Sequence, residues 1–117
     1  MSFNSLSMGK KLNLLPGTLH LLILKMLSQH ATLHGYGMAQ LLANTTEGVL
    51  EVDEGSLYPA LQRLLLEGWV EAEWGKSENN RRARYYRLTS SGLAQLHTEE
   101  TTFDRLLEAM LRVLRPA

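Results

Sequence analysis

The sequence has no cysteine among its 117 residues, which excludes disulfides, thiolate metal sites and cysteine-based redox sensing. Its longest apolar run, Leu21–Leu24, is far shorter than the ~20 residues that a membrane-spanning helix needs. It shows neither a glycine-rich phosphate loop nor a secretory signal. Its 12 basic and 12 acidic side chains cancel. We therefore expect a cytoplasmic protein with no membrane partner, no metal, no cofactor and no catalytic activity.

The neutral total hides an uneven charge distribution. Acidic side chains cluster over residues 47–54, whereas four arginines and two tyrosines lie between Arg81 and Arg87. Such a concentration of positive charge indicates a surface that meets a polyanion. The alternative is a solvated strand face, in which the arginines pair with Glu71 and Glu73 across a hairpin.

Hydrophobic periodicity predicts four helices and one β-hairpin. The helices are expected near residues 15–27, 36–45, 54–68 and 90–114, and the alternating strands near 69–74 and 82–88. Residues 49–52 could add a very short strand. Asp53 or Glu54 can cap the third helix and Gly68 can end it, while Thr89, Ser90 or Ser91 can cap the last. Pro59 must remove one helical hydrogen bond or delay the regular helix.

Two of these helices carry more apolar surface than one small domain can cover. The first is apolar on nearly all faces, and the last has a seam in steps of four and three that only Glu100 interrupts. Both patterns favour a second subunit. The predicted dimer interface comprises Leu19, Ile23, Leu96, Phe103, Leu107, Met110 and Leu114.

The order helix, helix, helix, hairpin, helix is typical of a winged helix-turn-helix, a mainly α fold with a small β-hairpin. In that fold the arginines lie on the wing, where they can neutralise DNA phosphates. Ser56 and Tyr58 lie near the start of the third helix, and Gln62 and Arg63 could reach base edges from it. Tyr58 could equally be a packed aromatic, and Arg63 a solvated cation.

Four stretches between Leu14 and Leu96 together resemble the PadR family of bacterial transcriptional regulators. They read LLPGTLHLLILKML, LHGYGMAQLL, EGSLYPALQRLLLEGWVEAEW and NNRRARYYRLTSSG. The resemblance is to the short-tailed branch, which has one C-terminal helix. It implies a winged-helix homodimer that binds an inverted-repeat operator, usually as a repressor.

The resemblance also implies site residues and a domain division. Residues 1–13 would be a flexible tail, 14–89 the DNA-binding domain and 90–117 the dimerisation helix. The residues implied in contact with double-stranded DNA are His34, Tyr36, Ser56, Tyr58, Pro59, Gln62, Arg63, Asn80, Arg81, Arg82 and Arg84. Tyr36 could touch a phosphate or pack instead.

Other readings stay open at this point. Winged helices also serve as protein-interaction adaptors or bind RNA, and an activator is indistinguishable from a repressor. His30 and His34 have a metal-ligand spacing, but the glycine that follows them argues against a helix there. Some relatives bind flat aromatic effectors between subunits. Here the last helix offers only Phe103, which fits the heptad seam better, and both tryptophans are expected to pack under the wing.

Overall fold

The computed structural model describes residues 12, 14 and 17–116. Within them the chain forms α2 (Thr18–Gln29), β1 (Leu33–His34), α3 (Gly35–Thr45), α4 (Glu54–Leu66), β2 (Val70–Lys76), β3 (Arg82–Leu88) and α5 (Ser90–Leu114). The predicted helices and hairpin are confirmed, and the fold is mainly α with a small antiparallel sheet. The predicted tail at residues 1–13 lies outside the described residues, except for Leu12.

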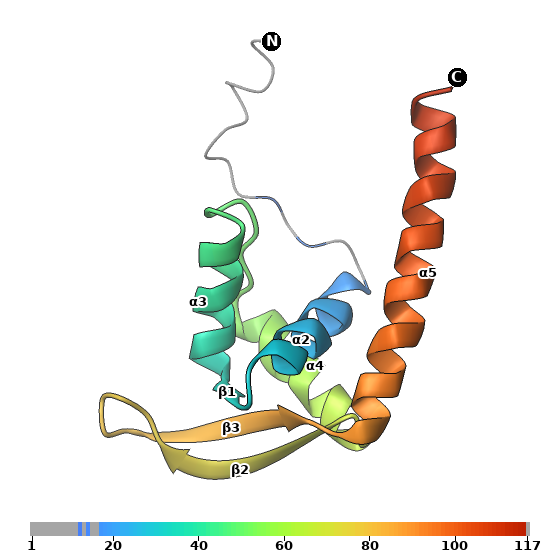
Figure 1. The fold of residues 1–117 in the computed structure, drawn as a ribbon. Helices are drawn as coiled ribbons and strands as arrows, with labels where there is room; N and C mark the ends of the chain where they lie inside the picture. Colours follow the sequence, from blue (N-terminus) through green and yellow to red (C-terminus); the bar gives the residue numbers. More distant parts are fainter. Residues whose placement is uncertain (1–11, 13, 15–16, 117) are drawn as a thin grey trace.

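Helices α2, α3 and α4 pack above the hairpin, and α5 stands to one side and projects beyond them (Figure 1). The core lies where these elements meet. Its most deeply buried side chains are Ile23, Leu24, Met38, Leu57, Leu61, Leu64 and Leu96. They come from four helices, so burial of their apolar surface holds the helices together around one centre.

The sheet has a third strand that the sequence did not indicate. The two residues of β1 pair antiparallel with β3, with Leu33 opposite Tyr86 and His34 opposite Tyr85, which gives the order β1-β3-β2. By contrast, the strand considered at residues 49–52 does not form. Only Leu50 makes an isolated bridge there, to Leu12. Two-residue pairings of this kind depend on a distant partner, so local patterns do not reveal them.

Helix α4 begins and ends at the predicted signals. The side chain of Asp53 accepts a hydrogen bond from the Ser56 amide at 2.7 Å. Gly68 has a positive φ of 75°, and the amides of Gly68 and Trp69 return to the carbonyls of Leu65 and Leu64. Pro59 lies inside the helix and leaves the carbonyl of Gly55 without its helical donor. Both residues are exposed, so water can satisfy that carbonyl.

The start of α5 is locked onto the turn between α4 and β2. Thr89 caps the helix by accepting from the Gly92 amide at 3.0 Å, and its hydroxyl donates to the carbonyl of Gly68 at 2.7 Å. The Ser91 hydroxyl donates to the same carbonyl. A Cβ atom at Gly92 would lie 1.9 Å from the carbonyl oxygen of Trp69. Only glycine permits this approach, which sets the direction in which α5 leaves the domain.

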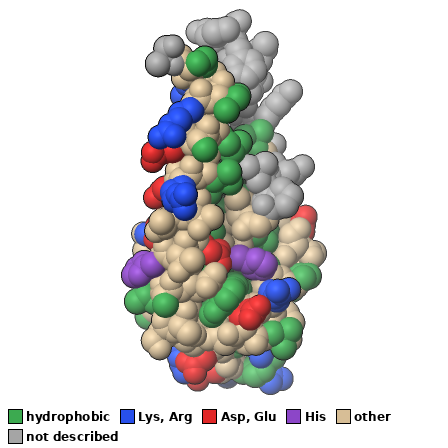
Figure 2. All heavy atoms as spheres, turned by 90° about the vertical axis from the view of Figure 1, so that its right-hand side faces the viewer, with side chains coloured by type: hydrophobic (Ala, Val, Ile, Leu, Met, Phe, Trp, Pro, Cys, Tyr) green, Lys and Arg blue, Asp and Glu red, His purple; other side chains and the backbone are tan. Residues whose placement is uncertain are grey.

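The charged position in the seam of α5 has a partner in the same chain. The Lys25 ammonium of α2 lies 3.1 Å from the Glu100 carboxylate. Beyond this contact, every side chain from Thr101 to Arg115 is exposed except Leu111, which is half-buried. Figure 2 shows hydrophobic side chains following the projecting part of α5. The exposed ones include Phe103, Leu106, Leu107, Met110, Val113 and Leu114.

The predicted dimer interface needs one correction. Ile23 is 0 % and Leu96 1 % exposed in the single chain, so both belong to its core and offer no surface to a partner. Leu19 is half-buried against the same core. The helical spacing that suggested these residues is real, but within the chain α5 packs its first turns on α2.

Candidate nucleic-acid interface

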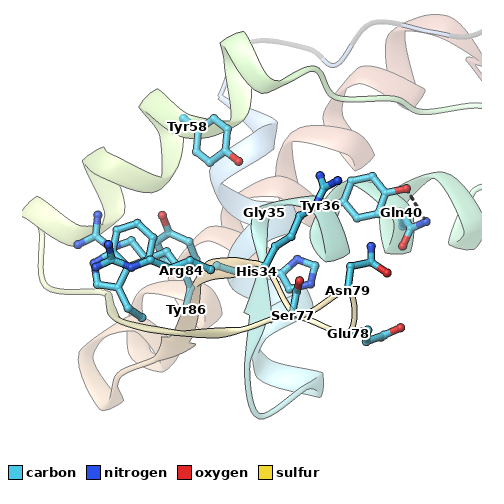
Figure 3. A pocket seen from close by; sticks show the side chains of 14 residues that line it. His34, Gly35, Tyr36, Gln40, Tyr58, Ser77, Glu78, Asn79, Arg84 and Tyr86 are labelled. Carbon is cyan, nitrogen blue, oxygen red and sulfur yellow. Dashed lines mark hydrogen bonds between the residues drawn. The ribbon is translucent and has the colours of Figure 1, made fainter.

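The starts of α3 and α4 and the hairpin surround a cavity of about 790 Å³. Six of the residues predicted to bind DNA line it, namely His34, Tyr36, Tyr58, Arg81, Arg82 and Arg84. Figure 3 shows Tyr58 reaching in from α4, whereas Tyr36 and Gln40 lie next to each other on α3, away from Tyr58. The hairpin supplies Ser77, Glu78 and Asn79 from its turn. The fold therefore brings together side chains that are up to 52 positions apart in the sequence, from His34 to Tyr86.

The two faces of the hairpin use its arginines differently. On the outer face, the Arg87 guanidinium pairs with Glu71 at 3.2 Å and Glu73 at 3.6 Å. Across the described residues, Arg81, Arg82 and Arg84 have no acidic partner within 4.0 Å. The alternative hypothesis, a solvated strand face on which the arginines pair with Glu71 and Glu73, therefore applies to Arg87 but not to the other three. The other three arginines keep their positive charge available at the cavity.

Trp74 lies among these arginines. It was expected to pack under the wing, but it does not. It is 57 % exposed and lines the cavity. The guanidinium of Arg82 lies 4.2 Å from the centre of its ring, which is a cation–π distance. Trp69, by contrast, is half-buried and packs against the core. Alternation places Trp74 on the same face of β2 as the buried Val70, but it does not show how far along the strand the core covers that face.

The inner wall of the cavity is a group of polar atoms. The ring of Tyr86 is 4 % exposed, and burial raises the pKa of its hydroxyl above the ordinary value of 10.0, an effect that the charge of Arg84 partly offsets. The Nε atom of Arg84 is itself buried, with no hydrogen-bond partner in the described structure. An unpaired buried donor is costly. The rest of this half-buried side chain lines the cavity, where its charge is available to an anionic ligand.

Helix α3 presents its first turn to the cavity. His34 caps the helix, because its Nδ1 accepts from the Gly37 amide at 2.9 Å, and the edge of its ring meets Tyr85. Tyr36 is 65 % exposed and its hydroxyl accepts from Gln40 at 3.1 Å. Gly35 is buried against Tyr58, where a Cβ atom would lie 3.3 Å from the ring. His34 thus shapes the site, and Tyr36 presents a hydroxyl at its mouth.

The remaining predicted DNA-binding residues lie outside the cavity but on exposed surface. Ser56, Pro59, Gln62 and Arg63 follow the exposed side of α4, where Arg63 pairs with Glu67 at 3.2 Å. Asn80 has a positive φ of 60°, and its amide donates to the Ser77 carbonyl at 2.9 Å, so it shapes the turn of the hairpin.

None of the described helices is long and apolar enough to cross a membrane. The described residues also contain no group of three or more potential metal ligands.

Comparison with known proteins identifies a family and several solved structures that this chain resembles. The family model described as "Transcriptional regulator PadR-like family" matches residues 23–98. A PadR family transcriptional regulator from Eggerthella lenta has a similar structure, with a TM-score of 0.73 and 26 % identity over 99 % of this chain and 93 % of its own. A PadR-like regulator from Bacillus cereus gives 0.71 and 28 %, over 86 % and 95 %.

Two further matches cover less of the proteins compared. The structure of Bacillus subtilis PadR in complex with operator DNA gives a TM-score of 0.61 and 25 % identity, over 69 % of this chain and 46 % of that one. A protein of Lysinibacillus sphaericus, described as "Uncharacterized protein X", is 35 % identical over 63 residues. That match spans 54 % of this chain and 58 % of the relative.

Proposed function

Because the chain belongs to the PadR-like family of transcriptional regulators, we propose that it binds an inverted-repeat operator as a homodimeric repressor in the cytoplasm. The observation that carries the proposal is a set of three arginines that have no acidic partner among the described residues and share one cavity with the starts of α3 and α4. The solved complex of B. subtilis PadR with operator DNA supports DNA as the polyanion.

In this proposal α4 enters the major groove and the wing follows the flanking backbone. Gln62 and Arg63 lie on the exposed side of α4, where base edges are within reach, and Arg63 must exchange Glu67 for DNA. Arg81, Arg82 and Arg84 neutralise phosphates, and Tyr36 adds a hydroxyl from α3. Residues 14–89 form the DNA-binding unit.

The proposed dimer uses residues 90–117, and above all the projecting half of α5. Its exposed apolar side chains, including Phe103, Leu107, Met110 and Leu114, repeat at heptad spacing and have no cover within the described chain. A second copy related by a two-fold axis would cover them. The direction of α5 would then set the distance between the two α4 helices, and so the spacing of the half-sites.

A fluorescence-anisotropy titration tests the function directly. Duplex DNA from upstream of the protein's own gene is compared with a scrambled duplex of equal length, at several salt concentrations. We expect tighter binding to the upstream duplex, with an affinity for both that falls as salt rises. Absence of binding to either duplex at low salt would contradict DNA recognition and favour the adaptor function.

A further inference from the structure

Trp74 and two wing arginines share one face of the hairpin. In the register of β2 and β3, Trp74 lies directly opposite Arg84. Side chains alternate along a strand, so Arg82, two residues before Arg84, points to the same face and lies diagonal to Trp74. This face looks into the cavity, which all three residues line.

The guanidinium groups lie against aromatic rings on this face. That of Arg82 is 4.2 Å from the centre of the Trp74 ring. That of Arg84 is 5.9 Å from the ring centres of both Trp74 and Tyr86. Tryptophan is the strongest cation–π partner among the side chains, and guanidinium planes stack well on it. The exposed indole therefore lies close to Arg82 and within cation–π range of Arg84.

Holding these side chains matters because arginine loses much rotamer freedom when it binds a fixed anion. A side chain that is already placed loses less on binding. We propose that Trp74 is a positioning residue of the interface, which aims Arg82 and Arg84 at a backbone phosphate that enters the cavity. This inference rests on the proposed function. Among the described residues neither arginine has an acidic partner within 4.0 Å, which supports an anionic occupant independently of the stacking.

The chain supplies a matched control in its other tryptophan. Trp69 precedes β2, packs against the core and has no arginine over its ring among the described residues. Trp74→Leu removes the π face but keeps an apolar side chain, Trp74→Phe keeps a weaker π face, and Trp69→Phe makes the same change away from the cavity. Circular dichroism and thermal denaturation establish that each variant is folded.

The experiment measures the affinity of the full chain for the scrambled duplex at low salt, because phosphate contacts do not depend on sequence. We expect Trp74→Leu to weaken binding about three- to tenfold, Trp74→Phe to lie in between and Trp69→Phe to match the wild type. Trp74→Leu is also made in the Arg82→Ala/Arg84→Ala background. If the indole acts through the arginines, it has little further effect there.

The outcomes separate the inference from the function on which it rests. Wild-type binding that Trp74→Leu leaves unchanged overturns the positioning role alone. An equal loss in the presence and absence of the two arginines also overturns it, since the indole would then act by itself. If Trp74→Leu is unfolded, Trp74→Phe and its cycle with the arginines decide in the same way. A wild-type chain that binds no duplex overturns the proposed function as well.

Discussion

Arg84 and Arg87 lie three residues apart on β3 and have opposite environments. Arg87 is exposed and paired with two glutamates, whereas Arg84 is half-buried, lies near two aromatic rings and has an unsatisfied Nε atom. The sequence shows four similar arginines in this segment. For Arg82, Arg84 and Arg87 the pleat of β3 decides which side chains keep a free charge, because neighbouring positions face opposite sides.

Also at the residue scale, the burial of Tyr86 should make the free energy of unfolding fall as the pH becomes alkaline. Burial raises the pKa of its hydroxyl in the folded chain, so above pH 10.0 the unfolded chain ionises first. The stability that the neutral, buried Tyr86 hydroxyl contributes is fully present below that pH. It is lost as the pH rises through the pKa that this hydroxyl has in the folded chain. Chemical denaturation between about pH 8 and pH 11 should show a shallower loss of stability in Tyr86→Phe than in the wild type.

The control for this prediction is Tyr36→Phe, which removes the hydroxyl of a tyrosine that is 65 % exposed. It should keep the wild-type pH dependence. Equal slopes for the wild type and Tyr86→Phe would contradict the role of the buried hydroxyl.

Gly92 is the residue at which a single methyl group should cost most. The added Cβ would overlap the carbonyl of Trp69, and backbone cannot move aside as a flexible side chain can. We expect Gly92→Ala to lower the free energy of unfolding by about 1–3 kcal/mol, as overpacked sites do. Ser90→Ala, at an exposed position two residues earlier, should change it little. Urea denaturation measures both, and equal stability of the two variants would contradict the close contact.

At the scale of the element, the hairpin acts as a two-sided surface. On its outer face, Arg87 forms ion pairs with Glu71 and Glu73. Its inner face carries the arginines that line the cavity and keep their charge unpaired among the described residues. An element with both signs of charge explains how a protein of net charge +0 can still attract a polyanion locally.

The two faces should differ in their salt dependence. Replacement of both Arg81 and Arg82 by Ala should weaken binding to all DNA sequences and reduce the slope of log K against log salt by about two. Arg87→Ala, on the outer face, should reduce the slope less per charge removed. Anisotropy titrations over a salt series measure both slopes. A slope left unchanged by the double substitution would count against the wing as a phosphate-binding element.

At the scale of the whole molecule, α5 is attached firmly at one end and uncovered at the other. Thr89, Ser91 and Gly92 fix its start on the α4–β2 turn, and the Lys25–Glu100 pair ties it to α2. Any change in how two copies pack along α5 would therefore move the DNA-binding units relative to each other. In the proposed dimer, this arrangement would couple the packing of the two copies to operator affinity.

A charge in the seam of α5 should separate the copies. We expect Leu107→Glu combined with Met110→Glu to shift the protein from dimer to monomer in sedimentation experiments and to weaken operator binding, because buried carboxylates would be unpaired. Ala109→Glu is the control, since Ala109 lies beside Arg105 and Arg112 on another side of the helix. A double variant that remains dimeric would contradict the proposed interface.

The local elements of this protein could be read from its sequence because their signals are local. Asp53, Gly68 and Thr89 act within a few residues of themselves, as caps and a helix stop, and alternation along residues 69–74 and 82–88 predicts the hairpin. The concentration of arginine on that hairpin is equally a property of the chain itself.

Only the tertiary structure decided what those elements do together. The pairing of β1 with β3, the exposure of Trp74, the burial of Ile23 and Leu96 in one chain and the contact of Gly92 with Trp69 all join distant segments. Such contacts depend on register and packing direction, which a periodic pattern does not encode. The arginines were visible in the sequence, whereas their division between a paired outer face and an open cavity followed from the fold.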